Sequence, residues 1–495
     1  MNGMEKNCSA LINRRIIPSG LSCRNSNAAV SFSIKDFLMK SKRTETRHRT
    51  IKVSFLSAEN SEVCEWSVDM GLKLKIRRHR GAGDKIRDRH GMRQRSLLKK
   101  GFAVIFLFLL GSAVAFAQSR TKRDTTIILI SDVTVQLEAT DAMNNLYNFK
   151  FEKAAVQFRD FKEKYRWHPL PYFLMGLAEW WKIMPNLRET KYDAKFLAYM
   201  DSAIVIAENL YKNYPEYKIE AAFFLAAAHG FKGELHADVE RKNWFKAAGE
   251  GKAALKYMEV CREKNNLSPE LLFGDALYNY FREWVPENYK SLKPIFWVFR
   301  HGDKKLGLQQ LKEVSYNAFY TRTEAMVWLM RILAGYENDL QRAFQIAEYL
   351  HQTYPDNPYF HRYYARMLYS LSMPKVEEQS KQILQRIDSG RFGYEAVSGR
   401  YAAFFLGQFY EFRRNLDESK KYYLLGVKYS EEVGAIDSGY YLYSLISLGE
   451  IADKQKDKAT AKKYFNLVKK KAGRKDEAYK DAKARLKRLE KASKD

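Results

Sequence analysis

The residue types that most often support catalysis occur in this chain, but their spacing matches no reaction centre. Ala248–Lys252 is similar to a phosphate-binding loop, yet it lacks the earlier glycine and the Ser or Thr that should follow the lysine. Between His229 and His236 lie two glycines and no carboxylate that joins them at metal-ligand spacing. No HExxH, GxSxG or paired-carboxylate motif occurs in the repeats described below. We therefore predict no catalytic residue, no cofactor and no metal.

Cysteine usage favours the same interpretation. Cys8, Cys23 and Cys64 lie in the N-terminal segment, and Cys261 is alone in the rest of the chain. One cysteine has no partner for an intramolecular disulfide, and no CxxC or Cys/His cluster is present to bind a metal. Because Cys261 shares a predicted helix face with small and apolar residues, we expect a buried and unreactive thiol.

The elements that position these residues are repeated helix pairs. Ala365 follows Arg331 by 34 residues, the period of the tetratricopeptide repeat. In such a repeat, a small residue at the eighth position of the first helix meets another at the twentieth position, in the second helix. We assign the eighth position to Ala142, Gly176, Ala226, Gly274, Arg331, Ala365, Gly407 and Gly449. We assign the twentieth to Ala154, Ala203, Ala254, Gly307, Ala343, Ser380, Ser419 and Ala461. Arg331 departs from the small-residue rule, and Ser380 fits only with one inserted residue.

The chain thus resembles the tetratricopeptide repeat (TPR) family, and in particular its secreted bacterial members. The resemblance implies an all-α fold, a right-handed α-solenoid of about eight TPR-like helix hairpins over residues 140–471. The Lys- and Ala-rich residues 472–495 predict a basic capping helix that closes its open end. Three long spacings between repeats predict longer helices or loops in the first half.

One long insertion has an order of its own. Phe273-Gly274 is followed by Pro286 and Pro294, and then by a Gly302-Asp303 turn towards Gly307. This order resembles the tetratricopeptide-repeat-39 type family of eukaryotes over residues 170–315. The resemblance implies a Gly-containing helix, a Pro-bearing stretch and a Gly-Asp-basic turn into the next helix. It brings no catalytic residue.

A solenoid of this kind binds partners on its concave inner face. Arg362 and Arg366 lie one helical turn apart and are spaced to hold a carboxylate. The Asn residues that complete a peptide clamp in some TPR proteins are missing at the matching places. Aromatic and Arg side chains, which anchor recognition surfaces, fill the groove-facing positions. The predicted groove residues are Phe173, Trp180, Trp328, Arg362, Arg366, Tyr369 and Phe404, beside Tyr359, Tyr401 and Gln408. For any one aromatic, packing against a neighbouring repeat is an equally good interpretation.

Residues 92–117 have the three parts of a secretory signal peptide: a basic start, an apolar run from Gly101 to Val114, and Ala115-Phe116-Ala117. We expect cleavage between Ala117 and Gln118, and a periplasmic protein. Residues 1–91 are interpreted as a disordered upstream extension, with translation starting at Met92. Residues 118–139 lead into the solenoid.

The net charge of +27 lies mostly at the two ends of the chain. Residues 1–117 hold 23 Lys and Arg against 9 Asp and Glu, and residues 454–495 hold 17 against 6. The repeats between them are nearly neutral, which does not favour a specific nucleic-acid-binding fold. The basic C-terminal helix is a candidate for binding an anionic envelope polymer or lipid.

The function that these features favour is a non-enzymatic scaffold of the cell envelope, which binds a peptide or protein in its groove. One alternative is a membrane-anchored TPR adaptor that keeps residues 101–117 uncleaved, although this apolar run is short for a membrane span. A second alternative is an enzyme with its site in the long insertions. The partner and the oligomeric state are not encoded in any motif.

Overall fold

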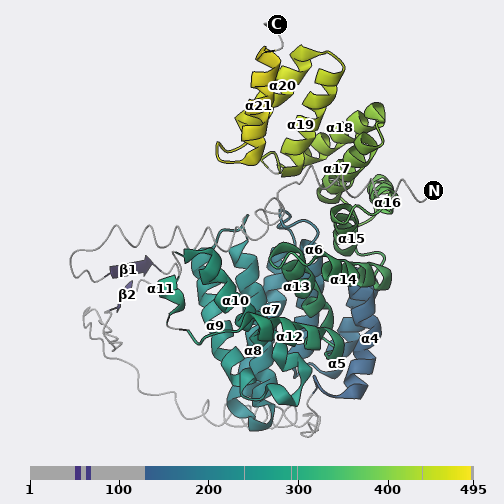
Figure 1. Cartoon of the computed structure of the whole chain (residues 1–495). Coiled ribbons are helices and arrows are strands. Elements are labelled where there is room, and N and C mark those ends of the chain that lie inside the picture. The colour runs from purple at the N-terminus through teal and green to yellow at the C-terminus, as the bar shows by residue number, and fades with distance from the viewer. Residues whose placement is uncertain are drawn as a thin grey trace, which may run out of the picture. The chain divides into compact units, whose positions relative to one another are not determined.

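The computed structural model describes residues 129–238, 240–290, 293–297, 299–437 and 439–491, together with two strands at residues 51–56 and 63–68. Helices fill the described part beyond residue 129 and pack against their neighbours in the chain (Figure 1). The first four pairs are α4 (Val133–Tyr147) with α5 (Phe151–Lys164), α6 (Pro169–Ile183) with α7 (Asp193–Asn213), α8 (Lys218–Ala237) with α9 (Trp244–Arg262), and α10 (Leu272–Asn288) with α12 (Lys304–Asn317).

The second half continues the same arrangement. The pairs are α13 (Arg322–Gly335) with α14 (Leu340–Thr353), α15 (Pro358–Ser370) with α16 (Val376–Asp388), α17 (Ala396–Phe412) with α18 (Leu416–Glu432), and α19 (Gly439–Lys454) with α20 (Lys458–Lys471). A last helix, α21 (Glu477–Lys491), packs on α20. The predicted all-α solenoid of about eight TPR-like hairpins with a C-terminal capping helix is confirmed.

The turns inside the hairpins explain why the chain reverses where it does. Four second helices begin after a non-glycine residue with positive φ, followed by an Asp or Asn whose side chain accepts a hydrogen bond from the first turn of the helix. The pairs are Lys242-Asn243, Asn338-Asp339, Arg414-Asn415 and Lys456-Asp457. The cap satisfies a backbone N–H that has no partner within the helix. The local sequence therefore ends one helix and starts the next within a few residues.

The assigned eighth and twentieth positions all fall in the expected first and second helices. Gly407 in α17 and Ser419 in α18 meet directly, with Ser419 Oγ donating to the Gly407 carbonyl oxygen at 2.9 Å. A Cβ at Gly407 would lie 2.6 Å from the ring of Tyr423, so the close approach of the two helices requires glycine there. The small-residue rule thus predicts the hairpin contact correctly at this repeat.

Two assigned positions behave differently. A Cβ at Gly274 would meet Met258 of α9 at 3.2 Å, so Gly274 faces the preceding hairpin instead of Gly307. The Arg331 side chain is too large for a close contact between two helices. Its Nη1 lies 3.8 Å from Oε1 of Glu234 in α8. The longer helices and the inserted α11 (Lys293–Phe296) displace the register in this region.

The long repeat spacings of the first half correspond to long helices and extra turns. Helices α7, α8 and α9 have 21, 20 and 19 residues. Short 3-10 turns occur at Pro215–Tyr217, Asn265–Leu267 and Pro269–Leu271. The turn predicted before α12 is present, since the Asp303 carboxylate accepts from the N–H groups of Lys305 and Leu306 at 2.8 and 3.1 Å.

The solenoid also makes contacts between distant repeats. Glu324 of α13 is buried and accepts hydrogen bonds from Trp181 Nε1 at 2.8 Å and Tyr147 Oη at 3.1 Å. Asn357 Nδ2 donates to the Tyr147 carbonyl oxygen at 3.0 Å. Burial raises the pKa of Glu324 to about 7, against the opposing effect of these two donors. The first hairpin therefore packs against the fifth and sixth, although a regular solenoid has contacts between adjacent repeats only.

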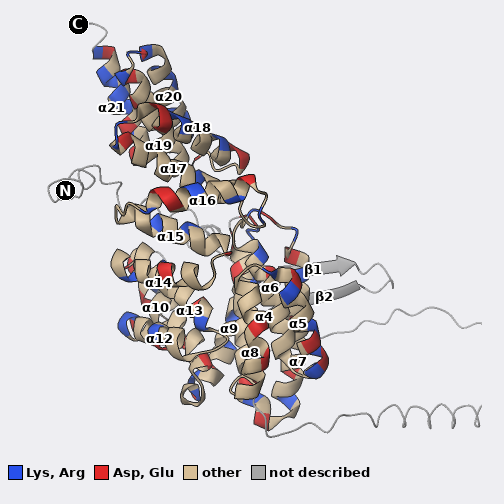
Figure 2. Ribbon diagram, turned by 90° about the vertical axis from the view of Figure 1, so that its right-hand side faces the viewer, with Lys and Arg blue, Asp and Glu red and all other residues tan. Residues whose placement is uncertain are grey.

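The capping helix packs its apolar side and exposes its basic side. Ala478, Ala482, Leu486 and Leu489 are buried. Arg485 pairs with Glu450 of α19 at 2.7 Å, and Arg488 with Asp453 at 2.9 Å. Figure 2 shows the remaining Lys and Arg residues along α21. These contacts close the last hairpin, as a cap must.

Cys261 is buried beneath α8 in the described structure, with 3% of its surface exposed. Its Sγ lies 4.0 Å from the Ile219 carbonyl oxygen. Burial raises the pKa of the thiol to about 12, so the reactive thiolate is scarce at neutral pH. This agrees with the predicted unreactive core thiol.

Two strands, β1 (Ile51–Leu56) and β2 (Val63–Val68), form an antiparallel pair in a separate unit of residues 38–126. This hairpin is not predicted from the sequence. The signal peptide at residues 92–117 and the cleavage site at Ala117 and Gln118 lie outside the described residues, as does the apolar run at 101–117. In the part of the chain that the structure describes, no helix is long and apolar enough to cross a membrane.

Two stacked histidines occupy the contact between α14 and α15. The rings of His351 and His361 lie 4.4 Å apart, and His361 Nδ1 contacts Tyr394 Oη at 3.0 Å. Burial, and then the charge of Arg386, lower the pKa of His351 to about 4. Burial, His351 and Arg386 hold the pKa of His361 well below its usual value. Both rings are therefore neutral in the folded protein at neutral pH.

Acidification is expected to destabilise the fold through this pair. The unfolded chain takes up protons near pH 6.5, whereas folded His351 does so only near pH 4. The contribution of these neutral rings to the free energy of unfolding is therefore fully present above about pH 6.5. It decreases as the pH falls from 6.5 to 4. His351 alone should contribute a loss of about 2 kcal/mol between pH 7.5 and pH 5, measured in urea denaturation as the difference between the pH dependence of the wild type and that of His351→Gln. His351→Gln should flatten this dependence, and His301→Gln, at an exposed site, should not. Equal pH dependence in all three proteins would refute the assignment.

Candidate partner-binding face

The first helices of four successive hairpins share a face rich in aromatic and Arg side chains. We define the first-helix face by half-buried residues of α13, α15, α17 and α19: Trp328, Arg331, Tyr363, Arg366, Tyr369, Tyr401 and Tyr440. The Arg331 guanidinium lies 4.4 Å from the centre of the Trp328 ring. The Tyr401 and Tyr440 rings lie 4.6 Å apart, which joins α17 to α19.

Three arginines gather around Tyr401 on this face. The guanidinium of Arg400 lies 5.0 Å from the centre of the Tyr401 ring, and that of Arg362 lies 5.4 Å from it. Arg366 lies over the Tyr363 ring at 5.5 Å. We call Arg362, Arg366, Arg400, Tyr363, Tyr401 and Tyr440 the arginine–tyrosine cluster. At these distances the guanidinium groups make cation–π contacts with the rings.

The cluster has a positive potential. Burial alone would raise the pKa of Tyr401, but the charges of Arg400, Arg362 and Arg366 outweigh it, and the pKa of Tyr401 is lower than usual. A lowered tyrosine pKa means that a negative charge on the hydroxyl oxygen is stabilised. The same charges would stabilise an anionic group brought from outside.

The structure separates the predicted groove residues into two groups. Phe173, Trp180, Arg362 and Phe404 are buried, with 7%, 3%, 8% and 1% of their surfaces exposed. Phe173 and Trp180 pack on Phe231 of α8, at 5.8 and 5.5 Å between ring centres. Phe404 packs on Tyr440 at 5.0 Å. These side chains fill space between helices, whereas Trp328, Arg366 and Tyr369 are half-buried on the first-helix face.

Arg362 has a structural role that could not be predicted from its position on the helix. Its Nη1 donates to the Pro185 carbonyl oxygen at 3.1 Å and to Ser398 Oγ at 3.2 Å. The side chain thereby ties the loop after α6 to α15 and α17. Arg362→Ala is therefore expected to loosen that loop and to lower the stability of the fold.

Three members of the cluster were missed by the projection from the sequence. Arg400 and Tyr363 each neighbour a projected position, and Tyr440 lies in the last hairpin, which the projection did not reach. Arg400 and Tyr401 are adjacent in the sequence, and this pair could have indicated the cluster. Two arginines on α15 and one on α17 would have suggested a shared site.

The other residues considered from the sequence have structural roles. Gly249–Lys252 lies inside α9, and its Glu250 contacts His229 Nδ1 at 2.6 Å and Lys232 Nζ at 2.9 Å. His236 is buried at the end of α8. Within the described residues, no group of three or more His, Cys, Asp or Glu is placed to hold a metal ion.

The long insertion contains a buried polar network. Asp275 accepts from Arg300 at 2.7 Å, from Gln310 at 3.0 Å and from Asn279 at 3.1 Å. Asn279 also donates to Gln310 Oε1 at 2.8 Å. This network joins α10 to α12.

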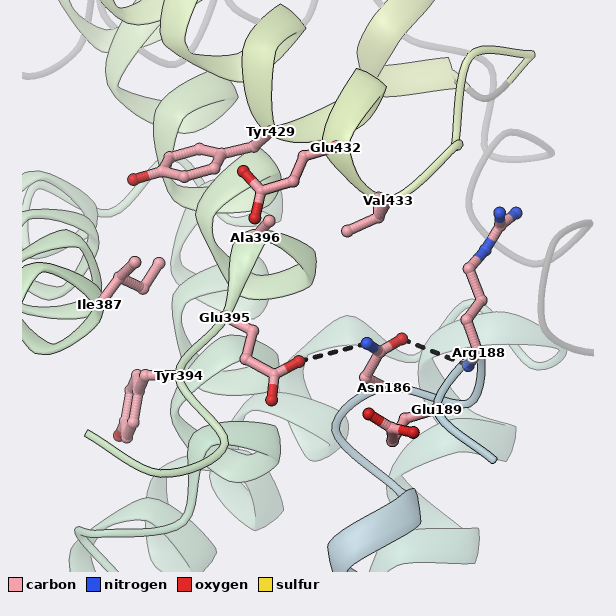
Figure 3. Close-up of a pocket in the computed structure, with 10 residues that line it drawn as sticks. All are labelled: Asn186, Arg188, Glu189, Ile387, Tyr394, Glu395, Ala396, Tyr429, Glu432 and Val433. Atoms are coloured by element: carbon pink, nitrogen blue, oxygen red, sulfur yellow. Dashed lines mark hydrogen bonds between the residues drawn. The ribbon is translucent and has the colours of Figure 1, made fainter. Parts of the chain in front are cut away.

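A cavity of about 540 Å³ lies between the loop after α6 and helices α16, α17 and α18 (Figure 3). Asn186 Nδ2 donates to Glu395 Oε2 at 3.2 Å, and the Arg188 N–H donates to Asn186 Oδ1 at 3.2 Å. The residues that line the cavity include no Ser, Cys or His. The residues that line it are Asn186, Arg188, Glu189, Ile387, Tyr394, Glu395, Ala396, Tyr429, Glu432 and Val433.

Comparisons with known proteins find likenesses among solved structures alone. No family model matches the sequence, and no curated protein does. Among solved structures, the chain is similar to a human IFIT1 dimer with PPP-AAAA, with 15% sequence identity and a TM-score of 0.34. The match covers 64% of this chain and 67% of that chain. At this level of similarity nothing about function follows, and the TPR-like fold rests on the helix pairs described above.

Proposed function

We propose that this protein is a non-enzymatic scaffold that binds a peptide or protein on its first-helix face. The supporting observation is that four successive first helices present Trp, Tyr and Arg side chains that remain half-buried after the hairpins have packed. These residue types supply most of the binding energy in protein interfaces. The rigid hairpins hold them in fixed positions, which lowers the entropy lost on binding.

The test removes two half-buried aromatic anchors of the first-helix face. In a pull-down from envelope extract, Tyr363→Ala with Tyr440→Ala should reduce capture of the wild-type partner at least tenfold. The matched control is Tyr349→Ala on α14, whose side chain is 49% exposed. Circular dichroism should show all proteins folded. Equal loss in the control and the double variant would place the binding surface elsewhere.

We further propose that the protein acts in the periplasm after export. The support is the signal-peptide pattern at residues 92–117. The mature protein should begin at Gln118 in N-terminal sequencing of material purified from its own cells. Peptides from residues 1–91 in that material would favour the membrane-anchored alternative.

The capping helix supports a separate proposal, binding to an anionic lipid or envelope polymer. Lys480, Lys483, Lys487 and Lys491 are exposed on α21, opposite its buried Ala and Leu side chains. Near an anionic surface each such charge contributes about 1 kcal/mol. Vesicles with anionic lipid should sediment the protein at low salt, and changing these four residues to Gln should abolish sedimentation. Unchanged sedimentation would reject this role.

A further inference from the structure

The insertion between α10 and α12 presents aromatic side chains to solvent. Trp297, directly after α11, is 85% exposed, which is the largest exposed fraction of any large hydrophobic residue in the described part of the chain. Phe299 is 39% exposed, and Leu306 in the first turn of α12 is 42% exposed. A single exposed aromatic is common on protein surfaces, whereas neighbouring ones indicate an interaction site.

The chain beside these aromatics is fixed to α10. The Arg282 side chain donates to the Phe299 carbonyl oxygen at 3.3 Å, and Tyr278 Oη donates to the Arg300 carbonyl oxygen at 2.6 Å. The Arg300 guanidinium in turn donates to Asp275 at 2.7 Å. Figure 1 shows α11 beside α10, at the outer edge of the described helices. The exposed aromatics therefore extend from a fixed base at the edge of the fold.

The charged residues around the aromatics are mostly basic. Residues 287–305 contain five Lys or Arg and two Asp or Glu. Both acidic side chains have partners, since Glu287 pairs with Lys304 at 3.3 Å and the Asp303 carboxylate caps α12. The exposed basic residues of this segment are Lys290, Lys293 and Lys305. The insertion thus combines exposed aromatic side chains with a net positive charge.

This combination fits the surface of a lipid bilayer. Residues 294–299 are all apolar, and basic residues stand on both sides of them. At a bilayer surface, Trp prefers the layer between headgroups and acyl chains, and neighbouring lysines keep their charges among anionic headgroups. The apolar run is far too short to span a membrane. An apolar contact at the surface is therefore the membrane interaction that the segment allows.

We propose that this insertion is a membrane-surface anchor, in which Trp297 and Phe299 enter the interfacial layer of a bilayer containing anionic phospholipid. Lys290 and Lys293 contact the headgroup phosphates. The anchor is independent of the first-helix face, and it differs from the contact proposed for α21 because it places aromatic side chains inside the bilayer. Two aromatic side chains give a weak and reversible contact, so it is measured with lipid in excess.

Trp297 is itself the reporter of the first test. Vesicles of phosphatidylcholine and phosphatidylglycerol, brominated on their acyl chains near the headgroup, quench Trp fluorescence only within the bilayer. They should quench the wild-type protein, and Trp297→Phe should lose this quenching while its circular dichroism is unchanged. Because α21 contains no Trp, binding through α21 does not produce this signal. Equal fluorescence changes in the wild type and in Trp297→Phe would overturn the proposal.

The charges are tested by titration with the same vesicles. Lys290→Gln with Lys293→Gln should raise the lipid concentration at half-maximal quenching by roughly tenfold, because two contacts with anionic headgroups are lost. The matched control is Tyr316→Ser on α12, which removes another exposed aromatic, 67% exposed, and should behave like the wild type. An unchanged lipid requirement in the double Lys variant would contradict the proposed headgroup contact.

Crosslinking in cells separates a bilayer from a protein at this site. p-Benzoyl-phenylalanine in place of Trp297 should crosslink to phospholipid, identified by mass spectrometry, and the same group in place of Tyr316 should not. Crosslinks from position 297 to a protein, with none to lipid, would show that a protein covers the insertion and would overturn the proposal.

Discussion

Replacing Glu270 with Ala is expected to lower the free energy of unfolding by about 4 kcal/mol, because several buried donors would lose their acceptor. The Glu270 carboxylate is 1% exposed. It accepts from the backbone N–H groups of Phe319, Tyr320 and Thr321 at 2.6, 2.9 and 2.9 Å, and from Thr321 Oγ1 at 2.6 Å. These groups lie directly before α13, the first helix of the fifth hairpin. Loss of the acceptor would loosen the helix that holds Trp328 and Arg331.

Urea denaturation followed by circular dichroism measures this effect. Glu263→Ala removes an exposed carboxylate from the turn after α9 and should change stability by less than about 0.5 kcal/mol. Glu270→Gln should fall between the two, since its amide keeps one acceptor oxygen. A Glu270→Ala variant as stable as Glu263→Ala would mean that water replaces the carboxylate without cost.

The second large effect concerns Gly307 and Gly249, where the same substitution by Ala should change stability in opposite directions. A Cβ at Gly307 would lie 2.7 Å from both the Ala276 carbonyl oxygen and the Tyr280 nitrogen, which are backbone atoms and cannot move aside. Gly307→Ala should therefore destabilise the fold by about 3 kcal/mol. Gly249 in α9 has open space at the same position, so Gly249→Ala should stabilise its helix by about 0.5–1 kcal/mol.

The comparison isolates helix packing from helix propensity, because the same substitution improves propensity at both sites. Thermal and urea unfolding of the two single variants should shift in opposite directions. Stabilisation by Gly307→Ala would show that α10 and α12 are farther apart than described. It would also weaken the assignment of Gly307 as the twentieth position of its repeat.

The sequence predicts the hairpins well because one physical rule governs them. Where two helices approach closely, only Gly, Ala or Ser fits, and the resulting period is visible without knowledge of the rest of the fold. Gly407 and Ser419 are placed correctly for this reason. The register is displaced at Gly274 and Arg331, where α11 and the long helices interrupt the period.

Phe173 and Arg362 show what a projection of groove-facing positions could not predict. Periodicity gives the face of one helix on which a residue lies, but not which distant helix covers that face. Phe231 of α8 covers Phe173, and the carbonyl of Pro185 takes one donor of Arg362. The contacts of Glu324 with Tyr147 and Trp181 likewise join helices that are far apart in the sequence. Such contacts depend on small rotations summed over several repeats, which no local motif records.

The most direct test of the central claim is site-specific photocrosslinking to the partner. p-Benzoyl-phenylalanine is introduced in place of Tyr363 on the first-helix face or in place of Tyr349, which is exposed on α14. A first-helix binding face predicts a crosslinked partner from position 363, competed by excess unlabelled protein, and none from position 349. Crosslinks from position 349 with none from position 363 would show that the partner binds another surface and would contradict the proposed function.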